Sequence, residues 1–135
     1  MQLQKIEKNN SEHGNFLEAF ADKKLISCAD IEISEALKIC FVYVGLTNYP
    51  GQSEKIFLIN FIRKNFGMFT KRELLLAFEL LAAGKIHAVS HFQNFSPQYL
   101  ASVMNAYKDK ANEVREKTEP PIVKRSEEHT SELQS

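Results

Sequence analysis

The stretch Thr70-Lys71-Arg72-Glu73 constrains the fold of this chain more strongly than any other part of its sequence. It has the pattern of a capping box, in which the threonine side chain accepts a hydrogen bond from the backbone N–H of Glu73 and the glutamate reaches back to the N–H of Thr70. Apolar residues then recur at helical spacing, and Gly84 follows them at a position typical of a helix end. The apolar face consists of Leu74, Ala77, Phe78 and Leu81. We therefore predict a helix that begins after Thr70 and buries this face.

Four other segments carry apolar residues at helical spacing and also predict helices. They run from Asn15 to Lys23, from Asp30 to Gly45, from Ser53 to Gly67 and from Ser96 to Lys117. Asp30, Ser53 and Ser96 are expected to be N-caps, and Pro97 would occupy the first helical position, where a missing N–H costs nothing. The run from Cys40 to Val44 is also compatible with a strand because it contains β-branched residues. The sequence predicts an all-α protein, a compact bundle of four main helices plus a short N-terminal helix.

The apolar pattern also predicts which helices are buried. The segment after Ser53 is apolar on more than one face, which indicates the central and most buried helix of the bundle. Its apolar residues are Ile56, Phe57, Ile59, Phe61, Ile62 and Phe66. The last helix has inward-facing apolar residues up to Tyr107, and the polar run from Lys108 to Lys117 is expected to project into solvent.

We expect four parts along the chain. Residues 1–29 form a loosely ordered N-terminal segment that includes the short helix, and residues 30–117 form the helical domain. Residues 118–124 contain two consecutive prolines and are expected to begin a linker. Residues 125–135 are a polar tail.

Composition places the chain among cytoplasmic proteins. Hydrophobic residues make up 44% of it, yet no run approaches the ~20 apolar residues of a membrane span. The N-terminus lacks the apolar stretch of a secretion signal. Cys28 and Cys40 are too few for a disulfide framework and form no CxxC pair, so both are expected to be reduced and at least partly buried. We therefore expect a cytoplasmic protein without a membrane partner.

No motif in the sequence predicts catalysis, a cofactor or a metal ion. His87 and His91 are four residues apart, but zinc needs a third ligand, and Ala88 stands where a metalloprotease has its glutamate. No glycine-rich phosphate-binding loop occurs. The acids Glu73 and Glu79 give no sign of a paired active-site arrangement. We therefore predict that the protein is not an enzyme and binds no cofactor.

Four basic residues flank one predicted turn between two helices: Arg63, Lys64, Lys71 and Arg72. Phe66 and Phe69 lie between them, and exposed aromatic residues interleaved with basic ones can bind single-stranded nucleic acid. Helical spacing nevertheless places most phenylalanines of this region in the core. The four basic residues are the candidate patch for a protein partner or for weak contact with DNA, and a solvated charged face explains them equally well. The formal net charge of +0 argues against a strongly basic nucleic-acid-binding protein.

The stretches NFGMFTKRELLLAFELLAAGKI and HFQNFSPQYLASVMNAYKDK resemble a group of small helical DNA replication proteins of tailed bacteriophages and prophages. The resemblance covers about half of the chain, and its layout is similar to that of helicase loader and inhibitor proteins. The matching positions are Thr70, Glu73, Ala77, Phe78, Gly84, Ser96, Tyr99, Val103, Ala106 and Tyr107. Each has a structural role as a cap, core residue or helix end, so the resemblance transfers no active site.

The resemblance implies a phage DNA replication accessory protein in the bacterial host cell, a helicase loader or replisome factor that binds a replicative helicase or another replisome protein. The alternative is a helical DNA-binding module, for an origin or for regulation, that uses the four basic residues. In loaders of this layout a C-terminal segment holds the helicase, and here that segment would begin after Pro121.

The last eleven residues, RSEEHTSELQS, resemble the translation of a standard high-throughput sequencing adapter. We therefore expect residues 125–135 to be a non-native tail from an untrimmed, metagenomic assembly, with the true C-terminus missing. The chain has 17 basic and 17 acidic residues, of which the tail holds Arg125 and three glutamates. Without the tail, 16 basic and 14 acidic residues remain, a net charge of +2.

Overall fold

A computed structural model describes residues 14–118 of the chain. This part is all-α, as predicted, and a single isolated bridge between Lys24 and Thr70 is its only β-type pairing. Residues 14–20 are helical and are followed by a short 3-10 helix, η1. The elements after them are η1 (Leu25–Ser27), α2 (Asp30–Tyr43), α3 (Gln52–Phe66), α4 (Lys71–Ala82) and α5 (Pro97–Thr118). The strand alternative for Cys40–Val44 is wrong, because α2 continues to Tyr43.

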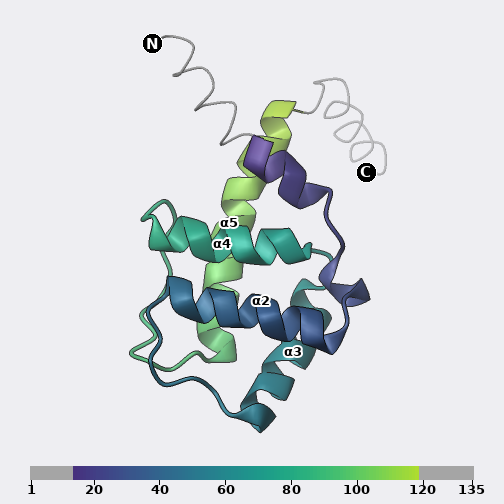
Figure 1. Ribbon diagram of the computed structural model, residues 1–135. Helices are drawn as coiled ribbons and strands as arrows, with labels where there is room; N and C mark the ends of the chain where they lie inside the picture. Colours follow the sequence, from purple (N-terminus) through teal and green to yellow (C-terminus); the bar gives the residue numbers. More distant parts are fainter. Residues whose placement is uncertain (1–13, 119–135) are drawn as a thin grey trace, which may run out of the picture.

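Helix α4 packs against α2 and α5, and α3 packs against α2, α5 and η1. Figure 1 shows α2 and α4 lying side by side, with α5 crossing behind them and α3 below α2. Half of the residues of α4 are buried, including Leu74, Ala77 and Phe78 of the predicted face, none of which is exposed at all. Helix α4 is therefore the most buried of the four long helices.

The prediction that the helix after Ser53 is the most buried one is wrong. Only Leu58, Ile59 and Ile62 of α3 are buried, while Ile56 and Phe57 remain 49% and 59% exposed. The helix packs with one face against α2, η1 and α5; Phe61 and Phe66 are partly buried at the edge of this face, whereas Ile56 and Phe57 lie off it. In α3, apolar residues on more than one face therefore indicate exposed apolar surface and not a central position.

The helix starts follow the predictions in two cases and differ in two. The Thr70 capping box is present, with distances of 3.0 Å for both of its hydrogen bonds, and Ser96 Oγ accepts from the N–H of Tyr99 at 3.1 Å. Asp30 and Ser53, in contrast, are not N-caps, because Ala29 and Gly51 occupy those positions. The reason is a glutamate at the third helical position of each helix.

These two glutamates cap their helices without help from an N-cap side chain. Glu32 accepts a hydrogen bond from the N–H of Ala29 at 2.8 Å, and Glu54 accepts one from Gly51 at 2.9 Å. Each carboxylate also places negative charge in the first turn, where it stabilises the helix dipole. A serine or an aspartate at the N-cap was therefore not needed.

The segment before α2 and the end of α5 are both part of the core. Phe16 and Leu25 are buried, so the core extends into residues that the sequence assigned to the N-terminal segment. The expectation that residues after Lys108 only project into solvent is wrong, since Ala111 is fully buried. The guanidinium of Arg115 also lies 4.1 Å from the centre of the Phe20 ring. The helix of residues 14–20 therefore covers the last turns of α5. The expected linker after Thr118 and the expected tail 125–135 lie outside the described residues.

Candidate protein-binding surface

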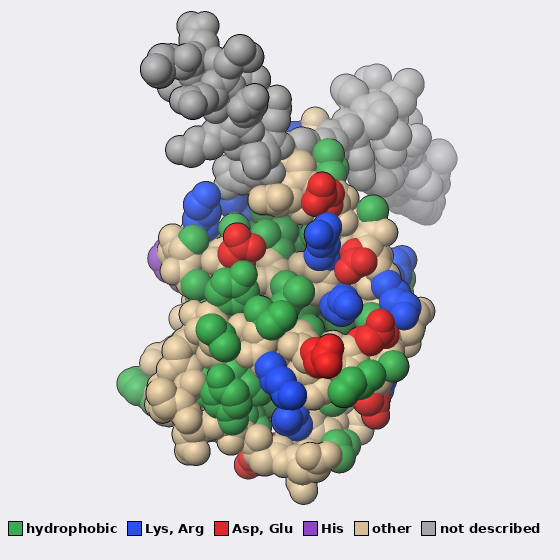
Figure 2. Space-filling model, in the orientation of Figure 1, with side chains coloured by type: hydrophobic (Ala, Val, Ile, Leu, Met, Phe, Trp, Pro, Cys, Tyr) green, Lys and Arg blue, Asp and Glu red, His purple; other side chains and the backbone are tan. Residues whose placement is uncertain are grey.

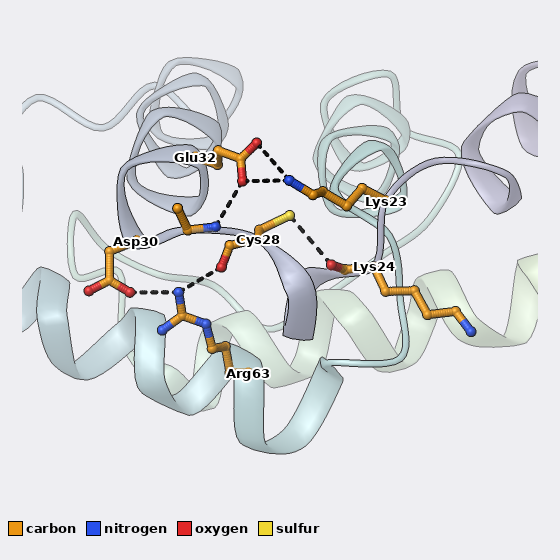
Figure 3. Close-up of polar contacts among 7 residues, drawn as sticks. Lys23, Lys24, Cys28, Asp30, Glu32 and Arg63 are labelled. Atoms are coloured by element: carbon orange, nitrogen blue, oxygen red, sulfur yellow. Dashed lines mark hydrogen bonds and ion pairs between the residues drawn. The ribbon is translucent and has the colours of Figure 1, made fainter.

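The four basic residues of the predicted patch do not form one free positive surface. Arg63 lies beside η1, where its Nη2 contacts Asp30 Oδ1 at 2.6 Å and donates to the carbonyl of Cys28 at 2.8 Å (Figure 3). Arg72 pairs through Nη1 with Glu18 Oε1 at 3.2 Å. Both guanidinium groups thus have acidic partners.

The two lysines of the patch differ in their surroundings. Lys64 is exposed, and Lys71 joins the backbone of Lys23, to whose carbonyl it donates its N–H at 2.9 Å. Lys23 in turn forms an ion pair with Glu32 at 3.2 Å. The Ala29 N–H and this lysine hold the pKa of Glu32 below its usual range. Figure 2 shows the same mixture on the face with α2 and α4 in front, where basic and acidic side chains alternate among apolar ones.

The histidines and cysteines show no arrangement for chemistry. His91 lies against the Tyr99 ring, 5.0 Å between centroids, and His87 is exposed. Both cysteines are buried free thiols, as expected, and burial raises the pKa of Cys40. Between residues 14 and 118, no group of three or more His, Cys, Asp or Glu side chains could hold a metal ion.

Glu73 has a second role that the sequence did not indicate. It is 2% exposed, and its Oε2 accepts a hydrogen bond from the Tyr107 hydroxyl at 2.7 Å, while Arg115 Nη2 lies 3.4 Å from the same oxygen. The Thr70 hydroxyl donates to the carbonyl of Ala19. Burial, followed by the bond to Glu73, raises the pKa of Tyr107. This buried network ties α4 and α5 to the N-terminal helix and serves the fold.

The connector between α4 and α5 contains the most unusual backbone of the described residues. Phe92 and Gln93 have φ angles of 44° and 64°, which makes them the two non-glycine residues with positive φ. This left-handed region costs energy for residues with a side chain, and such strain is found preferentially at functional sites. Phe92 is also 87% exposed, more than any other large hydrophobic residue of the described chain.

Gln93 holds this strained connector in place. Its side-chain oxygen accepts hydrogen bonds from the N–H of Thr47 at 2.7 Å and from the Thr47 hydroxyl at 3.1 Å. Its side-chain nitrogen donates to the carbonyl of Gly45 at 3.1 Å, and its backbone N–H donates to His91 Nδ1 at 2.9 Å. One side chain therefore ties the connector to the loop between α2 and α3.

A cleft of about 380 Å³ opens between this connector, the α2–α3 loop and the first turns of α3, and we name it the Tyr49–Phe57 cleft. Its lining residues come from three segments: Asn48, Tyr49, Pro50, Ser53, Glu54, Phe57, Leu58, Gln93, Asn94, Phe95, Ser96 and Pro97. Tyr49 and Phe57 are 50% and 59% exposed, whereas Phe95 is buried. The sequence predicted the last helix cap at Ser96 but not this cleft, because the three segments are distant along the chain.

The chain matches no protein-family model, no curated protein and no solved structure. No helix of the part of the chain that the structure describes combines the length and apolar character of a membrane span. What the surface can do is therefore inferred from its own residues.

Proposed function

We propose that this protein is an accessory factor of phage DNA replication that acts by binding protein partners, as a helicase loader or replisome factor, and has no catalysis of its own. The role in phage replication is inferred from the resemblance of its two sequence stretches to that group. Protein binding is inferred from one observation, the exposure of Phe92 on a strained connector beside the Tyr49–Phe57 cleft.

Aromatic residues are the ones most often found at the energetic centre of protein interfaces. An exposed phenylalanine gains apolar burial when a partner covers it, up to about 3 kcal/mol for complete burial. The gain is largest when little freedom is lost on binding. The Gln93 hydrogen bonds fix the connector before any partner arrives, so Phe92 is presented at low entropic cost.

The DNA-binding alternative has less support. The guanidinium groups of Arg63 and Arg72 already contact Asp30 and Glu18, and a phosphate would compete with these carboxylates. If DNA binding were the function, affinity would fall steeply with salt and would drop when Lys71 and Arg72 are both changed to alanine. Salt-independent or absent binding would exclude it.

Co-purification with a replicative helicase tests the proposal. We expect residues 1–124, and an intact homologue that retains its own C-terminal segment, to bind a phage or host replicative helicase and to alter its loading on DNA. Phe92→Ala should weaken this binding at least about fivefold, since truncation of a central interface residue costs over about 1 kcal/mol. Met68→Ala is the matched control, because Met68 is 70% exposed but lies in the α3–α4 turn. If the protein neither binds a helicase nor alters its loading, the proposal is wrong.

A further inference from the structure

We propose that the Tyr49–Phe57 cleft binds an arginine or lysine side chain in an extended segment of a partner protein. This inference rests on the proposed function, because it names the chemistry that such a partner would present. The observations behind it are the aromatic walls of the cleft, the charge of its lining and its size.

Two of the three aromatic walls, Tyr49 and Phe95, are held in position by the core. The Tyr49 ring packs on Phe41 with 5.2 Å between centroids, and the buried Phe95 contacts Phe41 at 4.8 Å and Phe78 at 5.5 Å. Tyr49 and Phe57 still expose about half of their surface to the cleft side and to solvent. Aromatic ring faces carry negative partial charge and attract ammonium and guanidinium groups. The walls are thus suited to a cation with an apolar stem.

The charge of the lining has the sign that a cation requires. Among the twelve lining residues Glu54 is the one with a formal charge, and no lysine or arginine contributes to the lining. Glu54 Oε1 accepts the N–H of Gly51 at 2.9 Å, which fixes the carboxylate at the edge of the cleft. Its other oxygen makes no hydrogen bond to the described residues, so it can accept one from a guanidinium or an ammonium group.

The size and the polar residues of the cleft fit one side chain with its neighbouring backbone. About 380 Å³ lies at the lower end of the range for ligand sites, and a whole helix would not enter it. Asn48, Ser53 and Asn94 lie in the lining and can hydrogen-bond to peptide groups on either side of the cation. An extended segment therefore fits better than a folded surface.

Binding of a blocked amino acid tests this chemistry directly. N-acetyl-arginine methylamide and its neutral counterpart N-acetyl-citrulline methylamide have the same shape and differ in charge. We expect the arginine compound to shift backbone amide signals of residues 48–54 and 93–96 in NMR spectra of the full-length protein. The citrulline compound should bind about two- to fivefold more weakly, as expected for the loss of one partly exposed ion pair.

Substitutions in the cleft provide the second readout. Glu54→Gln keeps an acceptor for the Gly51 N–H and removes the charge, so it should weaken binding of the arginine compound about two- to fivefold without unfolding α3. Phe57→Ala should weaken it as well. The matched controls are Glu35→Gln and Ile56→Ala, since both residues are exposed and neither lines the cleft. Equal binding of the citrulline compound, an unchanged affinity of Glu54→Gln, or no shifts in the cleft would each overturn the inference.

This experiment separates the cleft from the helicase proposal. If the arginine compound binds as expected but no helicase co-purifies, the proposed function is wrong and the cleft chemistry stands. If a helicase co-purifies equally well with Glu54→Gln and wild type, and the arginine compound does not bind, the cleft inference is wrong and the proposed function stands.

Discussion

Removal of the Tyr107 hydroxyl group tests the buried network that joins α4 to α5. In Tyr107→Phe the ring can keep its stacking on Phe16, at 6.0 Å between centroids, and its contact with Phe69 at 5.9 Å. No cavity larger than the hydroxyl oxygen forms. The loss is therefore the hydrogen bond to Glu73, which is 2.7 Å long, buried and made to a carboxylate.

Hydrogen bonds to charged groups contribute about 1.5–3 kcal/mol. Arg115 and the N–H of Thr70 still contact the Glu73 carboxylate in the variant, so it is not left without partners. We therefore expect the free energy of unfolding to fall by about 2 kcal/mol. For a domain of this size, that corresponds to a decrease in Tm of roughly 10 °C.

Urea unfolding followed by far-UV circular dichroism measures this change, because the chain has no tryptophan but is largely helical. The midpoint should fall at an unchanged m-value. Tyr99→Phe is the matched control: Tyr99 is 3% exposed, and its hydroxyl group forms no hydrogen bond within the described residues. A loss below about 0.5 kcal/mol for Tyr107→Phe, or equal losses for the two variants, would refute the reasoning.

Three further predictions concern the core, the connector and alkaline pH. Phe78→Ala should lower the free energy of unfolding by about 3–5 kcal/mol in the same urea experiment, because this side chain is fully buried on α4; a loss below about 1 kcal/mol would contradict its place in the core. Phe92→Gly should raise the free energy of unfolding by up to about 1 kcal/mol while it weakens helicase binding. The reason is that glycine adopts the left-handed backbone without strain, and the exposed Phe92 side chain contributes little buried surface. A less stable variant would show that the connector is not strained. Burial raises the pKa of Tyr99 to about 12 and also raises that of Tyr107, so the native state holds these two protons more tightly than the unfolded chain does. The free energy of unfolding should therefore be at its full value below pH ~10 and fall above it, less steeply in Tyr107→Phe. A free energy of unfolding that does not change up to pH ~12 would contradict this.

The helices could be predicted because their determinants are local. The Thr70 capping box, the Ser96 cap with Pro97, and Gly45 and Gly84 at left-handed positions all act within a few residues of the helix end that they define. The errors at Asp30 and Ser53 are local too, since a glutamate at the third helical position supplied the cap in each case. The existence of each helix did not depend on which residue capped it.

The candidate surface could not be predicted in the same way. Gln93 bonds to Thr47 over 46 positions of sequence, and neither residue belongs to a motif. The exposure of Phe57 contradicted the expectation from apolar periodicity, because periodicity gives the faces of a helix and not which face a neighbour covers. Conversely, the basic residues that looked like a patch are close in sequence, but two of them, Arg63 and Arg72, form ion pairs with Asp30 and Glu18, which come from other elements.

The sequence by itself determined that this chain forms helices, roughly where they begin and end, and that Leu74, Ala77 and Phe78 face the core. Caps, helix-ending glycines and apolar spacing act through neighbours in the chain, so they can be recognised without coordinates. Only the tertiary structure decided that α4 rather than α3 is the most buried helix, that the Tyr107 hydroxyl bonds to Glu73, and that Tyr49, Glu54 and Phe57 line one cleft. These properties depend on which faces meet when the helices pack, and burial and charge pairing between distant segments are fixed only then.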